Sequence, residues 1–417
     1  MRMTRRAALV CLGAGLLAGC GGTPRSAPAG RPTPPEPQFQ AVPNPRFDAW
    51  VGAFRPRAEA RGISRATLDA AFRDVGFLPE VIERDRNQVE FTRTLEDYLA
   101  IAASDERVAT GRQMLRQHGP LLREIEARFG VEPQVVTAVW GLESNYGARR
   151  GDVPVISALA TLAHDGRRGA FFESQLIAAL RILQAGDVTP ERMRGSWAGA
   201  MGHTQFIPTS YLAYAVDFRG DGRRDIWSDD PTDGLASAAA YLARSGWRRG
   251  RRWGMEVRLP EGFAGPTGRR ATRSVADWTA RGVRDMDGRP LPDHGPAAIL
   301  RPAGAAGPAF AVFPNFGVIL RYNNAESYAI GVGHLSDRIA GGPPIRGRFP
   351  PDAQGMTMAD RRELQTRLTA AGFDAGVADG VIGTRTRDAI RAYQGRAGLQ
   401  ATGEPSRELL RRLRAAG

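Results

Sequence analysis

The chain of 417 residues contains no lysine, and all 57 of its basic residues are arginine. This absence excludes chemistry that depends on a lysine side chain, such as Schiff-base formation or phosphate binding by a Walker A loop. Histidine is scarce too: none of the five has the spacing of a metal-ligand pair, which argues against a zinc hydrolase. There is also no G-x-S-x-G nucleophile motif. Several common enzyme classes are therefore excluded or disfavoured.

Cysteine is limited to Cys11 and Cys20, within the first twenty residues, so neither a disulfide framework nor thiol catalysis is expected in the folded body. Three arginines precede an apolar run of about a dozen residues, shorter than the roughly 20 that span a bilayer, which fits a secretory signal over residues 1–19. The run ends in Leu-Ala-Gly-Cys, which resembles a bacterial lipobox with Cys20 as the lipidated first residue of the mature chain. A plain signal peptide is the alternative.

Residues 20–45 predict a tether, because they are rich in proline, glycine and alanine and contain few apolar anchors. The residue after the cysteine is Gly21 rather than aspartate. The resemblance to bacterial lipoproteins therefore implies a periplasmic protein anchored in the outer membrane by lipid. The formal charge of +13 predicts an anionic neighbour, either a carboxylate-bearing wall polymer or phospholipid.

Changes in hydrophobic period divide the rest of the chain. Residues 46–250 follow a helical period, and Ser64, Pro120 and Pro133 are expected at or next to helix starts. The first of these helices is expected to run as far as Val75. From about 251 to 322, short apolar segments between Gly/Pro-rich turns predict strands. The expected strands are 256–259, 310–313 and 318–320.

The predicted fold class is mainly α (α+β), with a small β-rich insert in a helical body over residues 46–340. Residues 341–356 are rich in proline and glycine and predict a linker. Residues 357–417 return to a helical pattern and predict a small separate module. The helices expected in that module are 358–371, 384–396 and 404–414.

A glutamate interrupts the apolar face of the helix that is expected to begin at Pro133. The positions i, i+3, i+4 and i+7 of that face are Val136, Val139, Trp140 and Glu143. Burial against valine and tryptophan disfavours the charged carboxylate, so we expect a raised pKa suited to a general acid. The glycine that soon follows ends the helix and would leave the acid at the lip of a cleft. A structural acid paired with arginine or turned to water stays open.

Three segments carry a family resemblance. They are A-V-W-G-L-E-S-N-Y-G at 138–147, S-W-A-G-A-M-G-H-T-Q-F-I-P at 196–208, and R-Y-N-N at 321–324 followed by Tyr328. They resemble the catalytic-glutamate segment, the G-A-M-G-x-x-Q-F-x-P signature and the R-Y-N…Y motif of the membrane-bound lytic murein transglycosylase B family. That family belongs to the lysozyme-like superfamily, so the resemblance implies a lysozyme-like catalytic domain.

The resemblance implies cleavage of the β-1,4 bond between N-acetylmuramic acid and N-acetylglucosamine in peptidoglycan, for turnover or remodelling of the cell wall. Glu143 would protonate the glycosidic oxygen and then act as base on the muramic C6 hydroxyl, giving a 1,6-anhydro end. Neither the Glu143 helix nor the G-A-M-G segment holds a second acid, and Asp152 is expected to be a surface or capping residue. The alternatives are a hydrolytic muramidase and a non-catalytic lipoprotein that tethers the outer membrane to the wall.

The resemblance also implies supporting roles for other residues. Ser196 would lie near the glutamate, and Gln205 would hydrogen-bond a substrate acetamido or hydroxyl group. Asn323 and Tyr328 would approach Glu143 and orient it or stabilise developing charge. Three aromatic rings could face sugars, although the first is equally suited to the core. These are Phe206, Tyr146 and Tyr322.

Residues 217–225 resemble the start of an EF-hand loop. Asp217, Asp221 and Asp225 stand at positions one, five and nine, with a glycine at position six. Arg219 departs from the pattern, because position three normally supplies an oxygen ligand. The closing acid would be one of Asp229, Asp230 and Asp233. No cofactor is required for the expected reaction, and a structural calcium and a polar turn held by aspartate–backbone hydrogen bonds are both open.

The C-terminal module is similar to the three-helix peptidoglycan-binding domain of wall enzymes. Its predicted core is Leu364, Leu368, Ile390 and Leu409, and the Asp379-Gly380 pair and Gly383 would shape a loop beside the binding groove. A small helical dimerisation module is the alternative. The expected partners are peptidoglycan glycan strands and, through the lipid anchor, the outer membrane. No nucleic-acid partner is expected, and protein partners cannot be read from the sequence.

Overall fold

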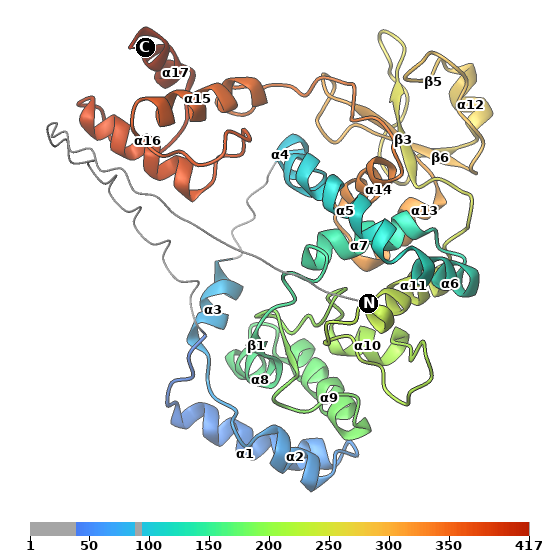
Figure 1. Cartoon of the computed structure of the whole chain (residues 1–417), viewed down its shortest axis with the longest axis vertical. Coiled ribbons are helices and arrows are strands. Elements are labelled where there is room, and N and C mark those ends of the chain that lie inside the picture. Colours follow the sequence, from blue (N-terminus) through green and yellow to red (C-terminus); the bar gives the residue numbers. More distant parts are fainter. Residues whose placement is uncertain (1–38, 88–93, 417) are drawn as a thin grey trace, which may run out of the picture. The chain divides into compact units, whose positions relative to one another are not determined.

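The computed structural model describes residues 39–87 and 94–416 (Figure 1). The predicted signal, Cys20 and most of the predicted tether lie outside the described residues. Within the described part of the chain, no helix has both the length and the apolar character needed to cross a membrane.

One hydrophobic core joins helices from two separate stretches of the chain. Its largest buried side chains include Phe47, Phe54, Leu159 and Phe172. Ser64 Oγ accepts a hydrogen bond from the backbone N–H of Thr67, which confirms the predicted helix start, but that helix ends at Ala71 rather than Val75. The helices around this core are α1 (Pro45–Glu59), α2 (Arg65–Ala71), α3 (Pro79–Arg86), α8 (Val155–Asp165), α9 (Gly169–Ala185) and α10 (Pro208–Tyr214).

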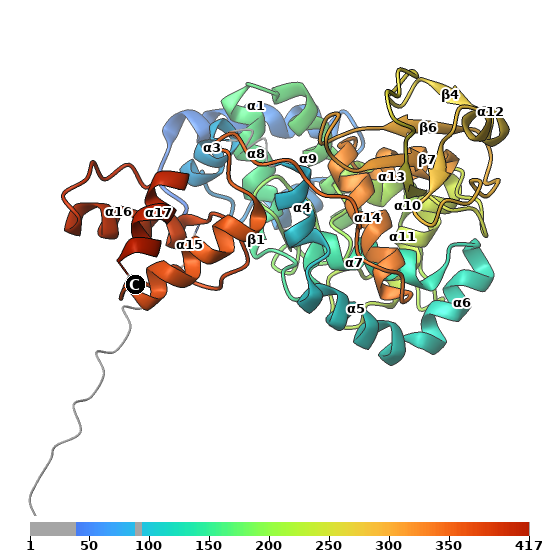
Figure 2. The same cartoon turned by 90° about the horizontal axis from the view of Figure 1, so that it is seen from above.

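A second core contains the Glu143 helix. This helix, α7 (Pro133–Ser144), packs against α5 (Asp105–Gln117) and α14 (Glu326–Ile339), and the three lie side by side (Figures 1 and 2). As predicted, α7 begins at a proline, whose fixed φ suits the first turn. The other helices around this core are α4 (Leu95–Ala102), α6 (Gly119–Phe129), α11 (Thr232–Arg244) and α13 (Pro314–Tyr322).

The β-rich part contains a five-stranded antiparallel sheet in the order β4-β6-β7-β3-β5. Figure 1 labels β3, β5 and β6 of this sheet, and Figure 2 labels β4, β6 and β7. Trp278 of α12 (Val275–Ala280) is fully buried against it. The strands are β3 (Gly254–Arg258), β4 (Thr272–Arg273), β5 (Arg284–Asp285), β6 (Ala297–Leu300) and β7 (Ala309–Val312). A separate short pair, β1 (Val153–Pro154) and β2 (Arg194–Gly195), lies in the helical body.

The strand predicted at 318–320 is wrong, because these residues lie inside α13. A three-residue apolar run looks the same in a buried strand and on the buried face of a helix. The proline that begins α13 was the available signal, since proline is favoured in the first turn of a helix.

The C-terminal module has the three predicted helices, and the last begins three residues later than expected. They are α15 (Met358–Ala370), α16 (Thr384–Arg396) and α17 (Arg407–Ala415). The predicted core residues Leu364, Leu368, Ile390 and Leu409 are all buried together. The preceding segment is held to β3, because Glu256 accepts hydrogen bonds from two successive backbone N–H groups at 346 and 347, at 2.8 and 2.6 Å.

Candidate active site

Glu143 lies in the last turn of α7, where its carboxyl group is largely enclosed by protein. Burial raises the pKa of Glu143 to about 7, because removal from water disfavours the charged form. The Tyr328 hydroxyl donates a hydrogen bond to Oε1 at 2.5 Å, which opposes the effect of burial. Among the described residues, no donor is bonded to Oε2. Tyr328 therefore fixes Oε1 of Glu143, and Oε2 is available to a ligand.

Two tyrosines from the third motif stand close to this carboxyl group. Tyr328 is buried in the first turn of α14, and Tyr322 ends α13 with its hydroxyl bonded to the carbonyl of Thr204 at 2.6 Å. Burial and the charge of Glu143 raise the pKa of both tyrosines, so both hydroxyls stay protonated. The motif thus gives the acid neutral polar neighbours rather than a counter-ion.

No second carboxylate accompanies Glu143 among the described residues. Burial and the Tyr328 hydrogen bond account for the shift in its pKa, without a contribution from another acid. Asp152 is exposed, and its backbone carbonyl accepts a hydrogen bond from Arg194 at 2.6 Å. The geometry therefore matches a single acid better than the carboxylate pair of common glycosidases.

A buried histidine joins the end of α7 to the second motif. His203 Nδ1 accepts a hydrogen bond from Trp140 Nε1 at 3.1 Å, and its Nε2 meets the carbonyl of Ser228 at 2.8 Å. Ser144 Oγ, next to the catalytic candidate, donates to the His203 carbonyl at 2.6 Å. Burial lowers the pKa of His203, so a neutral imidazole forms both contacts. Its role could not be predicted from the sequence, because a lone histidine has no spacing signal.

Two polar residues of the second motif mainly shape its turn. Ser196 Oγ accepts a hydrogen bond from the backbone N–H of Ala200 at 3.0 Å, and no hydrogen bond between the described residues joins it to Glu143. Gln205 adopts a left-handed φ of 52° and donates from Nε2 to the carbonyls of Arg150 and Gly202. Its Oε1 receives no hydrogen bond from the described residues, so Gln205 can still offer an acceptor.

Two aromatic residues expected to face sugars lie in the core instead. Phe206 is 2% exposed and packs against Tyr241 and Tyr322. Tyr146 is 8% exposed, packs edge-on against Trp140 and donates its hydroxyl hydrogen to the Arg107 carbonyl at 2.7 Å. The expectation that these two rings stack on sugars is therefore wrong, and both rings serve to pack the core. Tyr322 is less buried and stays compatible with a sugar contact.

Asn323 directly follows the end of α13 and is exposed. Its Oδ1 accepts a hydrogen bond from the backbone N–H of Ala325 at 3.1 Å, which helps to start the turn into α14. No hydrogen bond between the described residues joins it to Glu143. The structure therefore supports the expected contact with Glu143 for Tyr328 but not for Asn323.

The aspartates of the EF-hand-like loop form hydrogen bonds with its backbone. Asp217 accepts three of them, from the N–H groups at 220, 221 and 222, and these lower its pKa. Asp225 and Asp233 also accept backbone hydrogen bonds, and Asp221 accepts one from residue 223. Arg219, at ligand position three, forms an ion pair with Glu124. The described residues hold no group of three or more acidic, histidine or cysteine side chains arranged for a metal, so they do not fit calcium in this arrangement.

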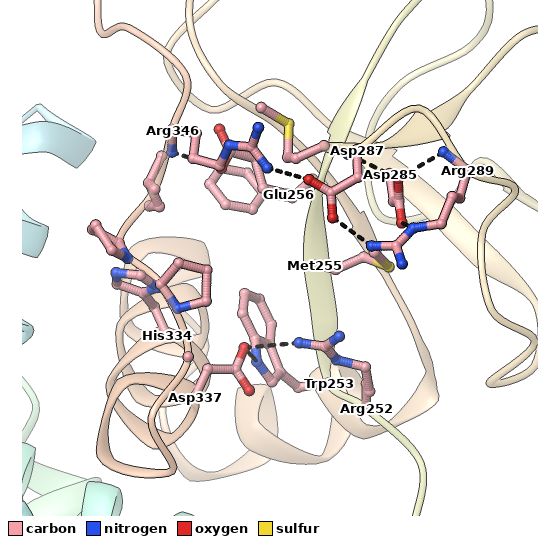
Figure 3. A pocket seen from close by; sticks show the side chains of 16 residues that line it. Arg252, Trp253, Met255, Glu256, Asp285, Asp287, Arg289, His334, Asp337 and Arg346 are labelled. Carbon is pink, nitrogen blue, oxygen red and sulfur yellow. Dashed lines mark hydrogen bonds and ion pairs between the residues drawn. The ribbon is translucent and has the colours of Figure 1, made fainter.

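A separate pocket of about 230 Å³ lies between α14, the β-rich part and residues 342–346 (Figure 3). The predicted site residues do not line it. Its charged side chains form ion pairs with one another, including Arg346 with Asp287 and Arg252 with Asp337. Burial and a nearby arginine lower the pKa of His334 to about 4. This pocket is lined by matched charges, in contrast to the uncompensated acid at Glu143.

A helical body that encloses one protonatable glutamate is typical of the lysozyme-like class of glycan-cleaving enzymes. Residues 46–337 match the family described as Transglycosylase SLT domain, and residues 357–413 match a peptidoglycan binding domain family. The chain belongs to the SLT transglycosylase family and carries a C-terminal peptidoglycan-binding domain.

Characterised relatives support this membership. The chain is 33% identical over 242 residues to membrane-bound lytic murein transglycosylase B of Escherichia coli K12, covering 56% of this chain and 64% of that protein, slightly less than two thirds of its length. SltB3 of Pseudomonas aeruginosa, in complex with NAG-anhNAM-pentapeptide, is 49% identical with a TM-score of 0.72, covering 89% of this chain and 100% of that one. Escherichia coli Slt35 in complex with calcium is 29% identical with a TM-score of 0.60, covering 71% and 93%.

Proposed function

We propose that this chain is a lytic transglycosylase that cleaves the β-1,4 bond between N-acetylmuramic acid and N-acetylglucosamine in peptidoglycan and leaves a 1,6-anhydro end. The observation that carries the proposal is Glu143, a single enclosed acid with a pKa near 7 and a neutral hydrogen-bond donor on one oxygen. A group with this pKa can both give and take a proton near neutral pH.

The reaction needs one acid that acts twice. The Glu143 carboxyl group donates its proton to the glycosidic oxygen as the bond from that oxygen to muramic C1 breaks. The muramic C6 hydroxyl then attacks C1 and returns its proton to the Glu143 carboxylate. One C–O bond breaks and one forms, no water is consumed, and the acid is regenerated. A second carboxylate is therefore unnecessary, in agreement with its absence around Glu143 among the described residues.

The neighbouring residues take complementary roles in this proposal. Tyr328 holds Glu143 Oε1 and directs Oε2 to the substrate. Tyr322 and the free Oε1 of Gln205 bind the sugar, with Gln205 accepting a hydrogen bond from an acetamido N–H or a hydroxyl. Ser196 and Asn323 act through the turns that they stabilise.

The relatives support this substrate and product. The SltB3 structures contain NAG-anhNAM-pentapeptide and NAG-NAM-pentapeptide, an anhydro form and an ordinary muramic form. The C-terminal domain binds peptidoglycan in this proposal and keeps the catalytic domain near its substrate. Lipidation at Cys20 anchors the protein on the periplasmic side of the outer membrane, where it serves cell-wall turnover or remodelling.

Mass spectrometry of soluble fragments from purified sacculi tests the reaction. The protein lacking residues 1–19 should release fragments that end in anhydromuramic acid, one water lighter than hydrolysed fragments. Reducing muramic ends would instead show a hydrolytic muramidase. Sacculi that bind the protein but release no fragments would favour the tethering lipoprotein.

Membrane fractionation tests the anchor independently of activity. Full-length protein should sediment with outer membranes, and the Cys20→Ser variant should lose this association. If Cys20→Ser still sediments with the membranes to the same extent, the lipid anchor is refuted. That result would leave the proposed catalytic reaction untouched, because this experiment does not measure activity.

A further inference from the structure

Arg107 is a half-buried arginine that has no counter-ion within the described part of the chain. It lies in the first turn of α5, where its backbone N–H donates to Ser104 Oγ at 3.2 Å and its carbonyl accepts from the Tyr146 hydroxyl at 2.7 Å. Its side-chain Nε is buried and has no hydrogen-bond partner. Among the described residues, no carboxylate forms an ion pair with its guanidinium group. The backbone of Arg107 is fixed while its charge is uncompensated.

Other partly or fully buried arginines in this chain show the contrast. Arg361, with a side chain 3% exposed, pairs with Asp97 and Asp352 at 2.6 Å each. Arg224, with a side chain 27% exposed, pairs with Asp187 at 2.6 Å. Removing a charged group from water costs free energy unless a partner compensates it. The described residues supply that partner for Arg361 and Arg224 but not for Arg107.

A second unpaired arginine lies nearby. Arg149 lies in the turn after α7, where its backbone N–H donates to the Ser144 carbonyl at 2.8 Å, three residues after the Tyr146 whose hydroxyl binds the Arg107 carbonyl. Burial and the positive charge of Arg149 both lower the pKa of Arg107, in agreement with this placement. Arg149 follows the end of α7, is exposed, and forms no ion pair with the described residues. Glu106 opposes these effects only weakly. Two neighbouring cations that form no ion pair with any described carboxylate favour the binding of an anion.

This pair lies beside the catalytic acid. The Tyr98 ring of α4 lies so close to Gly331 of α14, one turn after Tyr328, that a Cβ atom at this glycine would collide with it. Tyr98 also contributes to the raised pKa of Tyr328 and opposes the lowering of the pKa of Arg107. Tyr328 in turn donates to Glu143. Tyr146, which binds the Arg107 carbonyl, follows Glu143 by only three residues. An anion bound by the two arginines would therefore belong to the same ligand as the bond being cleaved.

We propose that Arg107 and Arg149 form a subsite for a carboxylate attached to the muramic acid residue of the substrate. The inference rests on the proposed function, because peptidoglycan supplies such carboxylates in two forms. In peptide-free glycan the lactyl group of muramic acid is itself a carboxylate, and in peptide-bearing glycan the carboxylates belong to the peptide stem. A guanidinium group can bind either one through two parallel charge-assisted hydrogen bonds.

Steady-state kinetics on matched glycans test the subsite. The substrates are peptide-bearing glycan, peptide-free glycan, and both glycans with their carboxylates converted to neutral methylamides. Arg107→Gln should lower kcat/KM about 10- to 100-fold on the glycan whose carboxylate is bound, mainly through KM, and should have no effect on its neutralised form. Arg107→Lys should retain part of the effect. Arg181→Gln, which changes an exposed arginine of α9, is the matched control and should behave as wild type.

The pattern across substrates decides the outcome. A loss on peptide-bearing glycan alone identifies a stem carboxylate, and a loss on peptide-free glycan alone identifies the lactyl group. Equal losses on charged and neutralised glycans would show a merely structural role and overturn the proposal, as would no loss on any glycan. If wild-type protein cleaves none of them, the proposed function itself is refuted.

A stability measurement separates binding from folding. Arg107→Gln removes an uncompensated half-buried charge, so its midpoint of thermal unfolding should equal or exceed that of wild type. Should this variant fail to fold, Arg149→Gln applies the same substrate comparison at an exposed position. Identical kinetics of Arg149→Gln and wild type on every charged glycan would then overturn the two-arginine subsite.

Discussion

Two acids with raised pKa values face opposite sides of α14. Tyr328 on one side of the helix donates to Glu143, and Asp337, nine residues later and so about half a turn around, accepts from Trp253 Nε1 at 3.0 Å and from Arg252 at 3.4 Å. Burial is the main cause of the raised pKa in both. Burial alone therefore does not distinguish a catalytic acid from a structural one.

The difference lies in the partners of each acid. Asp337 has an arginine beside it, and its pocket contains further matched charges (Figure 3). Among the residues that the structure describes, Glu143 has only a neutral tyrosine donor, on one of its two oxygens. A carboxyl group without a counter-ion can change its protonation state during a reaction without breaking an ion pair. The comparison predicts that Glu143 controls activity, whereas Asp337 has little influence on it.

The largest expected effect is that of Glu143→Gln. The amide cannot donate or accept the transferred proton, so glycan cleavage should fall at least about 1,000-fold. Release of anhydromuramic fragments from sacculi measures the loss. Sacculus binding should persist through the C-terminal domain. Turnover near the wild-type rate would remove Glu143 from the mechanism.

The pH dependence of protein stability, compared between wild type and Glu143→Gln, tests the raised pKa of Glu143 separately from activity. The pKa of Glu143 is raised from about 4.5 in the unfolded chain to about 7 in the folded protein, so the folded state binds the proton more tightly. Wild-type stability should therefore fall as the pH rises from about 4.5 to about 7, by about 2 kcal/mol after allowance for solvent screening. Denaturant unfolding at pH 4.5 and pH 8 should show this fall in wild type and a smaller one in the variant. An equal fall in both proteins would contradict the raised pKa.

Tyr328→Phe should have the next largest effect. The phenol stabilises the Glu143 carboxylate, so its removal raises the pKa of Glu143 further above 7. Wild-type kcat/KM should decline as the pH rises through about 7, because the first step needs the protonated acid. In the variant this decline should move to higher pH, and activity at pH 6 should drop about tenfold through lost orientation. A decline at unchanged pH would show that Tyr328 does not control the proton.

Much of this site could be predicted from the sequence. The helical period placed Glu143 on the buried face of α7, the proline predicted the start of this helix, and the glycine at 147 predicted an end close to Ser144. The third motif led to Tyr328. The sequence could not show that Phe206 and Tyr146 are buried, because an aromatic residue serves a core and a sugar subsite equally well. Those outcomes depend on contacts between distant segments.

Contacts between distant segments also explain what the sequence analysis missed. His203 bonds with Trp140 and Ser228, and Arg107 forms no ion pair with any of the described residues. Neither residue has a local sequence pattern that distinguishes it from the other histidines or arginines of the chain. The wrong strand prediction at 318–320 has the same cause, since the structure of a short apolar run depends on its surroundings.

Asp337→Asn should have a small effect and so sharpens the comparison. Arg252, with a side chain 43% exposed, forms a screened ion pair with Asp337, and the amide can still accept from Trp253. Loss of this pair should change the free energy of unfolding by less than about 1 kcal/mol. Cleavage of sacculi should stay within about twofold of wild type, as for surface changes outside the site. A loss of activity as large as that of Glu143→Gln would break the comparison, because a charge-matched acid would then be catalytic.

The smallest expected effect concerns acids whose partners are backbone amides. Asp217 already accepts three backbone N–H groups, and Arg219 stands at a ligand position, paired with Glu124. Addition of millimolar calcium to metal-free protein should therefore give no binding heat and no rise in the midpoint of unfolding, since a ligand that binds only the folded state raises it. Slt35 was solved with calcium, which makes the comparison direct. Arg219→Asp restores an oxygen at position three and should allow binding if that arginine is the obstacle. Binding of calcium by wild type would show that the loop exchanges its backbone hydrogen bonds for the ion.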